Sequence, residues 1–557
     1  MYRKQAGLVL AATLGACLWC ASPGFPQGAK FVVKTASGKV RGVARASGGA
    51  EFLGIPYAQP PVGNLRWREP APAKSWKGVR DAGAFGAPCS QPVLGDWNKH
   101  DAETSREDCL FLNVITPVWP AKEPLPVMLW LHGGANKGGT ASSELYKNGT
   151  LICHGVLLVT VNYRLGVFGF YAHPALTRES AHHASGNYGL MDQIAALDWV
   201  RKNIANFGGD PARITVFGQS AGAMDTSLLM TSPLSKDRFQ RAIAQSGSVL
   251  IAPPVPLAGA ESVGEKLAGL LGVPSGDAAV AHLRAIPAEG LLKALGKLDP
   301  KQGPRFGPIV DGWVIPRRPP GVFAAGEQSA IPMIIGSTTR EFSMTATPDE
   351  LRKIIENLTG DLAPEAFRLY GVADGASGEA DPLYGTVANQ WSADFTFRCP
   401  ATTQAAWHNA AHHPTFTYQF EHAIPGQEAD GAVHSSDLLY VFGFYPKSGN
   451  ISGNFNGTDF KLAELIETYW TNFAKQGNPN GPDAPNWPEF DGSQVYLAFT
   501  QDGRAVASSG PLRKPQCDLY REVLKRLMAA PEPRPSGPSA AKARRAMPKT
   551  TSSLGAS

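Results

Sequence analysis

Short apolar runs alternate with helix-like stretches along most of the chain. The candidate strands, rich in aliphatic, aromatic and β-branched residues, are 126–131, 156–161, 214–217, 332–335 and 415–420. Between them lie stretches with apolar residues near every 3.6 positions, such as 189–206, where Asp192 falls in the first turn. Strands that alternate with helices predict an α/β fold, with a large, mostly parallel central sheet flanked by helices.

Segment 253–305 interrupts this alternation. It is helix-rich and has no strong strand signal. On an α/β scaffold we expect such a helical insertion over the carboxyl edge of the sheet, where pockets form. No fixed-period repeat and no long linker divides residues 30–526, although the length alone would allow three or four domains. From 530 to 557 the chain turns to Pro, Ala, Ser and basic residues, which predicts a disordered basic tail.

The charge distribution excludes one class of partner. The chain of 557 residues has a formal charge of +5, but the tail 530–557 carries +4 and Arg3 with Lys4 a further +2, which leaves −1 for the body. A near-neutral body gives no support for a nucleic-acid-binding surface. Because 43% of the residues are hydrophobic, the chain has ample material for a core and is not disordered throughout.

The N-terminus has the pattern of an export signal, expected over 1–22. Two basic residues precede an apolar stretch, 6–16, whose 11 residues are too few to span a bilayer as a helix. Residues 14–17 resemble the lipobox of bacterial lipoproteins, which would place a lipid anchor on Cys17, and plain cleavage near Ala21 is the alternative. No later apolar run approaches 18 residues. We therefore expect an exported protein, periplasmic or secreted, with no transmembrane segment after the signal.

Five cysteines lie outside the expected signal, so at least one must stay free or pair between chains. Cys89 and Cys109, which are 20 residues apart around a polar stretch, are the natural short-range pair. Cys153, at the edge of the strand 156–161, is expected to be a buried bystander. No CxxC pair occurs outside the signal, so a cysteine-based zinc site is not expected.

The fragment Gly218-Gln219-Ser220-Ala221-Gly222 is a G-x-S-x-G that follows the strand 214–217 and precedes a helix-like run. A serine on such a sharp strand-to-helix turn needs small neighbours, and its hydroxyl projects above the sheet. A chance match in a glycine-rich chain is the alternative, and the strand-before, helix-after context disfavours it.

A second fragment, His132-Gly133-Gly134-Ala135, follows the strand 126–131. Small residues after a strand let backbone N–H groups turn toward one point, a geometry that suits an oxyanion. An ordinary glycine turn is the alternative. The position of the fragment, about 85 residues before the serine, matches the chain order of an α/β-hydrolase.

Further motifs carry a family resemblance. They are FLGIPYA at 52–58, PPVG at 60–63, EDCLFLNV at 107–114, VNYRLG at 161–166, GNYGL at 186–190 and NFGGDP at 206–211. With them the chain resembles the type-B carboxylesterases, the carboxylesterase/lipase family that includes cholinesterases and bacterial para-nitrobenzyl esterases. The resemblance runs from about residue 31 to 526 and implies one large α/β-hydrolase domain, 30–526, in place of several domains.

The resemblance also implies a catalytic triad of Ser220, Glu341 and His434. Glu341 lies in a Gly-x-x-x-x-Glu loop after the strand 332–335, as the triad glutamate of the family does. In this fold the base follows the acid, which leaves His408, His412, His413, His422 and His434 as candidates. Segment 433–442 resembles the catalytic-histidine segment of the family and favours His434.

Other residues follow from the same resemblance. The expected oxyanion donors are the N–H groups of Gly134, Ala135 and Ala221, and the expected disulfides are Cys89–Cys109 and Cys399–Cys517. The i, i+4 spacing of His408 and His412 could chelate a metal ion, but it has no carboxylate companion, so a surface helix face is the better interpretation. No metal and no cofactor is expected.

Two positions depart from the family pattern. Gln219 stands before the serine where most members have Glu, which removes a buried negative charge and makes a specialism for choline esters less expected. Ala135 ends the usual Gly-Gly-Gly run, keeping the N–H donor but adding a methyl group that points toward the substrate.

The sequence therefore predicts a serine carboxylic ester hydrolase that acts on a small-molecule ester through an acyl-enzyme on Ser220. Hydrolysis of amides, carbamates or thioesters by the same triad is the alternative among enzymes. A non-catalytic binding or adhesion protein is the rival class, disfavoured because all three triad residues are present.

Overall fold

The computed structural model describes residues 31–251, 254–276, 278–298, 306–373, 375–447 and 451–529. The expected export signal, 1–22, and the expected basic tail, 530–557, lie outside the described residues. Within them, eleven strands form one mixed sheet in the order β18-β17-β16-β13-β10-β9-β7-β8-β6-β4-β3. Adjacent strands are parallel from β17 through to β8. The pair β18–β17 at one end of the sheet is antiparallel, and so are β8–β6, β6–β4 and β4–β3 at the other end.

These strands are β3 Val43–Ala44, β4 Ala50–Pro56, β6 Phe111–Thr116, β7 Leu125–Leu131, β8 Leu157–Val161, β9 Gly209–Gln219, β10 Arg241–Gln245, β13 Met333–Thr338, β16 Thr415–Phe420, β17 Leu497–Phe499 and β18 Ala505–Ala507. Smaller sheets join β1 Val32–Lys34, β2 Lys39–Arg41 and β5 Val79–Asp81, β11 Val255–Pro256 with β12 Ile309–Val310, and β14 Val372–Ala373 with β15 Ala376–Ser377. All five expected strands are confirmed.

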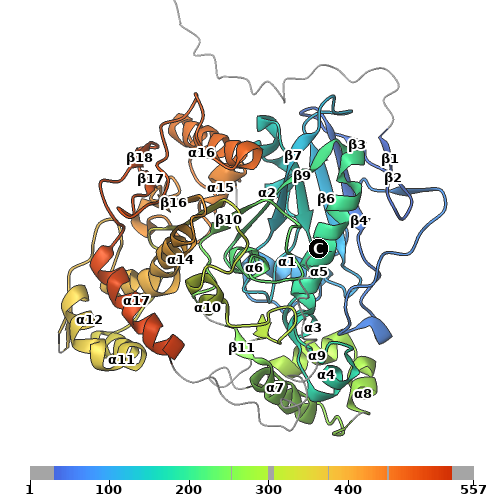
Figure 1. Ribbon diagram of the computed structural model, residues 1–557, viewed down its shortest axis with the longest axis horizontal. Helices are drawn as coiled ribbons and strands as arrows, with labels where there is room; N and C mark the ends of the chain where they lie inside the picture. The colour runs from blue at the N-terminus through green and yellow to red at the C-terminus, as the bar shows by residue number, and fades with distance from the viewer. Residues whose placement is uncertain are drawn as a thin grey trace, which may run out of the picture.

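The helices are α1 Lys99–Thr104, α2 Glu144–Asn148, α3 Gly166–Phe170, α4 Pro174–Glu179, α5 Tyr188–Asn203, α6 Ala221–Leu229, α7 Leu257–Leu270, α8 Ala279–Ala285, α9 Ala288–Leu295, α10 Pro319–Ala324, α11 Pro348–Thr359, α12 Ala363–Tyr370, α13 Val387–Ala393, α14 Cys399–Ala410, α15 Leu438–Val441, α16 Gly457–Gln476 and α17 Lys514–Ala529. Figure 1 shows them around the sheet, with α7, α8 and α9 grouped together beside α4. The large sheet flanked by helices confirms the expected α/β fold.

Strand β7 shows why its sequence is a continuous apolar run. Successive side chains of a strand point to opposite faces, and both faces of this strand are covered. Leu129 and Leu131 belong to the core cluster on one face, which includes α5 side chains such as Leu197. Trp130 belongs to the cluster on the other face, which includes Trp470 of α16. A strand buried on both faces lacks the alternation of apolar and polar residues that marks a half-buried strand. The shortness of its apolar run then indicates a strand and not a helix.

Segment 253–305 is helix-rich as expected, because it contributes α7, α8 and α9. It also holds one element that the sequence did not indicate, the two-residue strand β11, which pairs in parallel with β12. Leu292, Leu295 and Leu298 line a cavity of about 590 Å³ together with Leu165 and Phe168, which follow the carboxyl end of β8. The insertion therefore forms part of a pocket wall at the carboxyl edge of the sheet.

Two disulfides join the expected cysteines, Cys89 to Cys109 and Cys399 to Cys517. The second links the first turn of α14 to α17, across a sequence separation of 118 residues. Cys153 is buried as expected, but it is itself disulfide-bonded, so its description as a bystander is wrong. In the part of the chain that the structure describes, no helix is long and apolar enough to cross a membrane.

Candidate active site

Ser220 lies on a tight turn between β9 and α6, where the backbone is strained. It has φ 57° and ψ −121°, outside the usual regions for a residue with a side chain. The flanking glycines are sterically required. A Cβ on Gly218 would lie 2.4 Å from the carbonyl oxygen of Gly222, and one on Gly222 would lie 2.0 Å from that of Leu131. The turn leaves Ser220 partly exposed above the sheet, at the N-terminus of α6.

Glu341 follows β13, which is two strands from β9 in the sheet, so the carboxyl ends of parallel strands bring it to the same edge as the serine. Glu341 is only 1% exposed. Oε1 accepts hydrogen bonds from Ser246 Oγ at 2.7 Å and from the N–H of Thr338 at 2.8 Å. Oε2 is left to pair with His434 Nδ1. The carboxylate is therefore held on one side and orients an imidazole on the other.

His434 lies in the loop after β16, and its N–H donates to the carbonyl oxygen of Glu341 at 3.0 Å. Phe342 and Phe397 flank the imidazole ring at centroid distances of 4.1 and 4.9 Å. Nε2 faces the side-chain amide of Gln219, with Nε2 to Nε2 at 3.0 Å. Because the amide nitrogen is a donor, this contact requires a ring that is neutral, with its lone pair on Nε2. Among the described residues no hydrogen bond joins Ser220 Oγ to this nitrogen.

The turn after β7 carries Gly134 and Ala135, whose N–H groups are two of the three expected oxyanion donors. Gly134 and Ala135 have φ 107° and 57°, and a Cβ on Gly133 would lie 3.1 Å from Cβ of Ser220, so the turn packs against the serine. The N–H groups of Gly134, Ala135 and Ala221 donate to no protein acceptor within the described residues. Backbone N–H groups without a protein acceptor are the donor type that an oxyanion hole requires.

His132 supports this turn from below. Its Nδ1–H donates to the carbonyl oxygen of Gly133 at 2.8 Å, and its ring stacks on Tyr163 at 4.5 Å. Burial lowers the pKa of His132 to about 4, so the ring is neutral near pH 7. Tyr163 in turn donates its hydroxyl to the carbonyl oxygen of His132 at 2.6 Å.

Two residues that the sequence analysis did not single out belong to the site. Ser246 follows β10, the strand between β9 and β13, and a small polar residue at that strand end was a usable signal. Asp437, three residues after His434, is fully buried, and its Oδ2 accepts hydrogen bonds from Gln245 and Tyr418. Burial raises the pKa of Asp437 to about 6, with a smaller contribution from the charge of Glu341. Nothing in its local sequence indicated this environment.

The other candidate histidines lie elsewhere. His408 is fully buried, so the expectation that it occupies a surface helix face is wrong. Its Nδ1 accepts from Gln328 and its Nε2 donates to the carbonyl oxygen of Ile331, at 2.9 and 2.8 Å. With both ring nitrogens engaged, it cannot chelate a metal together with His412. His422 pairs with Asp459 at 2.9 Å, so its Nε2 is already engaged.

One group of the described residues could hold a metal ion: His154, Glu464 and Glu467, whose ligand atoms lie within 4.8 Å of one another. His154 precedes the amino end of β8, whereas Ser220 and Glu341 follow the carboxyl ends of their strands. The group therefore lies at the opposite edge of the sheet and takes no part in the site.

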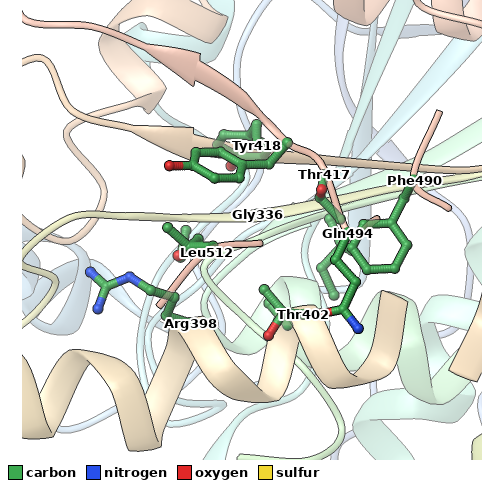
Figure 2. A pocket seen from close by; sticks show the side chains of 12 residues that line it. Gly336, Arg398, Thr402, Thr417, Tyr418, Phe490, Gln494 and Leu512 are labelled. Atoms are coloured by element: carbon green, nitrogen blue, oxygen red, sulfur yellow. The ribbon is translucent and has the colours of Figure 1, made fainter. Parts of the chain in front are cut away.

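A small pocket between the sheet and α14 is not the substrate site. Figure 2 shows it between Arg398 and Thr402 on one side and Thr417 and Tyr418 of β16 on the other. Its volume of about 10 Å³ holds about one water molecule, and no triad residue lines it.

Comparison with known proteins adds an independent finding. Residues 29–520 match the model of the carboxylesterase family. Fumonisin B1 esterase of Sphingopyxis macrogoltabida is 38% identical over 84% of this chain and 86% of that protein. Carboxylesterase 1D of Rattus norvegicus is 33% identical over 92% of this chain and 96% of that protein. A solved PNB esterase is 33% identical, superposes with a TM-score of 0.76, and is matched over 88% of this chain and 99% of its own.

Proposed function

The chain belongs to the carboxylesterase family and is a carboxylic ester hydrolase, and we propose that it cleaves its ester through an acyl-enzyme on Ser220. The observation that carries the proposal is the presence at one sheet edge of a strained, partly exposed serine, a buried Glu341 paired with His434, and three N–H groups with no acceptor among the described residues. This arrangement has the parts that acyl transfer needs: a nucleophile, an oriented base and a site for the oxyanion.

In the acylation step, Ser220 Oγ attacks the ester carbonyl and its proton passes to His434 Nε2. The N–H groups of Gly134, Ala135 and Ala221 stabilise the oxyanion of the tetrahedral intermediate. The intermediate collapses as Nε2–H protonates the departing alkoxide, which leaves as the alcohol. Water then attacks the acyl-enzyme with His434 again as base, and the acid is released with Ser220 restored.

Glu341 stabilises the imidazolium that forms in each step, and it fixes the tautomer of the neutral imidazole. Because Ser246 and Thr338 hold Oε1, the other oxygen is directed at Nδ1 and keeps the proton there. In the resting site the Nε2 lone pair accepts from Gln219, so proton transfer requires His434 to exchange this amide for the hydroxyl of Ser220.

Ester hydrolysis is preferred over the alternatives with the same triad. The two relatives described above are named as an esterase and a carboxylesterase, which does not favour amide or carbamate hydrolysis. A relative from Anas platyrhynchos is named a fatty acyl-CoA hydrolase, so an acyl-CoA thioester belongs among the test substrates. A non-catalytic role is disfavoured because the nucleophile, acid and base are all present. A panel of esters that varies acyl and alcohol size would define the substrate, and fumonisin B1 belongs in it because one relative carries that name.

A fluorophosphonate tests the proposal directly, because it phosphonylates only an activated serine. We expect stoichiometric labelling of Ser220, located by mass spectrometry of peptides, with loss of p-nitrophenyl butyrate hydrolysis in proportion. Labelling of another residue, or loss of activity without labelling of Ser220, would overturn the assignment.

We also propose that the chain is exported by its N-terminal signal, with cleavage near Ala21 or lipidation of Cys17 as the two routes. The pattern of basic and apolar residues at the N-terminus supports the proposal. The disulfides Cys89–Cys109 and Cys399–Cys517 are compatible with an oxidising compartment.

A further inference from the structure

The turn that carries the proposed oxyanion donors has a backbone that requires support. Gly134, Ala135 and Asn136 have φ of 107°, 57° and 57°, three consecutive residues in the left-handed region. Only glycine adopts that region without strain, and asparagine tolerates it better than alanine. The hydrogen bond from the N–H of Gly166 to the carbonyl oxygen of Asn136, at 2.6 Å, holds one side of the turn. A second contact must hold the side chain of Asn136, which is 2% exposed.

That contact is with Asp225, on the helix that begins after Ser220. Asn136 Nδ2 donates to Asp225 Oδ1 at 2.9 Å, and Gln193 Nε2 of α5 donates to Oδ2 at 2.6 Å. The carboxyl group is fully buried. It therefore joins the turn of Gly134 to Asn136, α5 and α6 at one point.

In this cluster the amide NH₂ groups have hydrogen-bond partners and the amide oxygens do not. Asn136 Oδ1 and Gln193 Oε1 are buried without a hydrogen-bond partner within the described residues. Both amides thus direct their NH₂ groups at the carboxyl and leave their oxygens unsatisfied. A buried carboxyl with two unsatisfied amide oxygens destabilises the fold relative to apolar packing, so its retention calls for a benefit other than stability.

We propose that Asp225 is a positioning residue, which holds Asn136 and through it keeps the N–H groups of Gly134 and Ala135 aimed at the oxyanion. The proposal rests on the oxyanion role assigned above. Oxyanion donors act by preorganisation, so a small displacement of the turn weakens transition-state stabilisation without weakening substrate binding.

The protonation state of Asp225 gives the proposal a signature. Only the carboxylate accepts from both amides at once, because a protonated carboxyl converts one oxygen into a donor. Burial raises the pKa of Asp225 to about 7, and the bonds from Asn136 and Gln193 oppose the rise. Of the other ionisable groups near it, Tyr163 donates to the carbonyl oxygen of His132 and both rings are neutral near pH 7.

The more distant charged groups around the cluster are either paired with an opposite charge or the same in wild type and variants. On α5, Asp192 is paired with Arg164 at 2.7 Å. His434 and its hydrogen-bond partners are unchanged in the variants. A ratio of wild-type to variant kcat therefore isolates the titration of Asp225.

Asp225→Ala, Asn136→Ala and the double variant form the primary test. We expect each single change to lower kcat for p-nitrophenyl butyrate by on the order of 10- to 100-fold, with KM within about threefold. Affinity for a trifluoromethyl ketone, whose adduct presents an oxyanion, should fall in parallel. The double variant should lose little more than the worse single variant, because the two residues act as one unit. Multiplicative losses, or kcat within about twofold of wild type, would overturn the proposal.

Asp225→Asn is a second test that does not depend on folding of the alanine variants. The ratio of wild-type to Asp225→Asn kcat should rise several-fold between pH 6 and 8, since only the aspartate gains its second acceptor there. A flat ratio contradicts positioning by the carboxylate. Thr226→Val is the matched control, because Thr226 is buried on the same helix, donates to the carbonyl oxygen of Gly222 at 2.8 Å and does not contact Asn136. Its kcat should stay near the wild-type value.

Fluorophosphonate labelling separates the two claims. If wild type is not labelled on Ser220, the proposed function fails. If Ser220 is labelled and the Asp225 variants keep wild-type kcat, only the positioning role fails.

Discussion

The side-chain amide of Gln219 occupies the lone pair of His434 Nε2, at 3.0 Å, which is the lone pair that must accept the proton of Ser220. Glu341 holds the opposite ring nitrogen, so the imidazole is clamped between an anion on Nδ1 and a neutral donor on Nε2. A glutamate at position 219 would reverse the second contact, because a carboxylate accepts from a protonated Nε2.

Gln219→Glu should therefore stabilise the protonated form of His434, since a nearby anion favours the imidazolium. The base is active when neutral, so the rising limb of the kcat/KM profile should move to higher pH. The same charge should selectively improve a cationic choline ester over its neutral isostere. The measurement is kcat/KM for both esters across pH, with Gln219→Met as the neutral control. Equal changes for both esters, or a strong choline preference in wild type, would show that shape alone selects the substrate.

Ser220→Ala should lower hydrolysis of p-nitrophenyl acetate by on the order of 10³-fold or more, because no neighbouring group replaces the nucleophile. Circular dichroism should show an unchanged fold. Ser227→Ala is the control. Ser227 is a buried serine on α6 whose hydroxyl accepts a hydrogen bond from Gln404 Nε2. More than a tenth of wild-type turnover in folded Ser220→Ala would refute the nucleophile assignment.

Ser246→Ala should lower kcat by on the order of tenfold, because it removes one of the two donors that fix Glu341 Oε1 and leaves the N–H of Thr338. Ser248→Ala offers a matched comparison, since Ser248 is equally buried but donates to Gln404 Oε1 at 2.6 Å. Ser248→Ala should lower the melting temperature and leave kcat near the wild-type value. Equal effects of the two variants on kcat would mean that Ser246 does not orient the acid.

Asp437→Asn should change the pH dependence of stability. Burial raises the pKa of Asp437 from 3.8 to about 6, so the folded state favours the protonated form. This stabilisation is fully present below about pH 4 and is lost as the pH rises to about 6. Relative to wild type, the variant should gain up to about 3 kcal/mol between pH 4 and 7.5. Urea unfolding at both pH values measures the gain, and a constant difference would contradict the raised pKa.

Export should leave a chain shortened at its N-terminus. We expect intact-mass analysis of the exported, active protein to show loss of the first 16 residues with a diacylglycerol on Cys17, or loss of a segment ending near Ala21 without lipid. Residues 1–22 still attached to exported protein would count against a signal.

The amino-acid sequence by itself determined the class of fold, the serine turn and the family. These features rest on local chemistry. The runs that became β7, β8, β9, β13 and β16 are strongly apolar, and the glycines beside Ser220 are needed because their neighbours leave no room for a Cβ. The pattern gave no comparable signal for β10, since Arg241–Gln245 contains two alanines and only one β-branched residue and is a strand because β9 and β13 enclose it.

Only the tertiary structure decided the environments of the polar residues. Whether a histidine is a base, a surface side chain or a core donor depends on what surrounds it, and the spacing of His408 and His412 could not show that His408 is buried with both nitrogens engaged. The same holds for Asp225 and Asp437, whose partners lie on segments remote in sequence. A charge is set by burial and by long-range neighbours, and neither is written in the residues beside it.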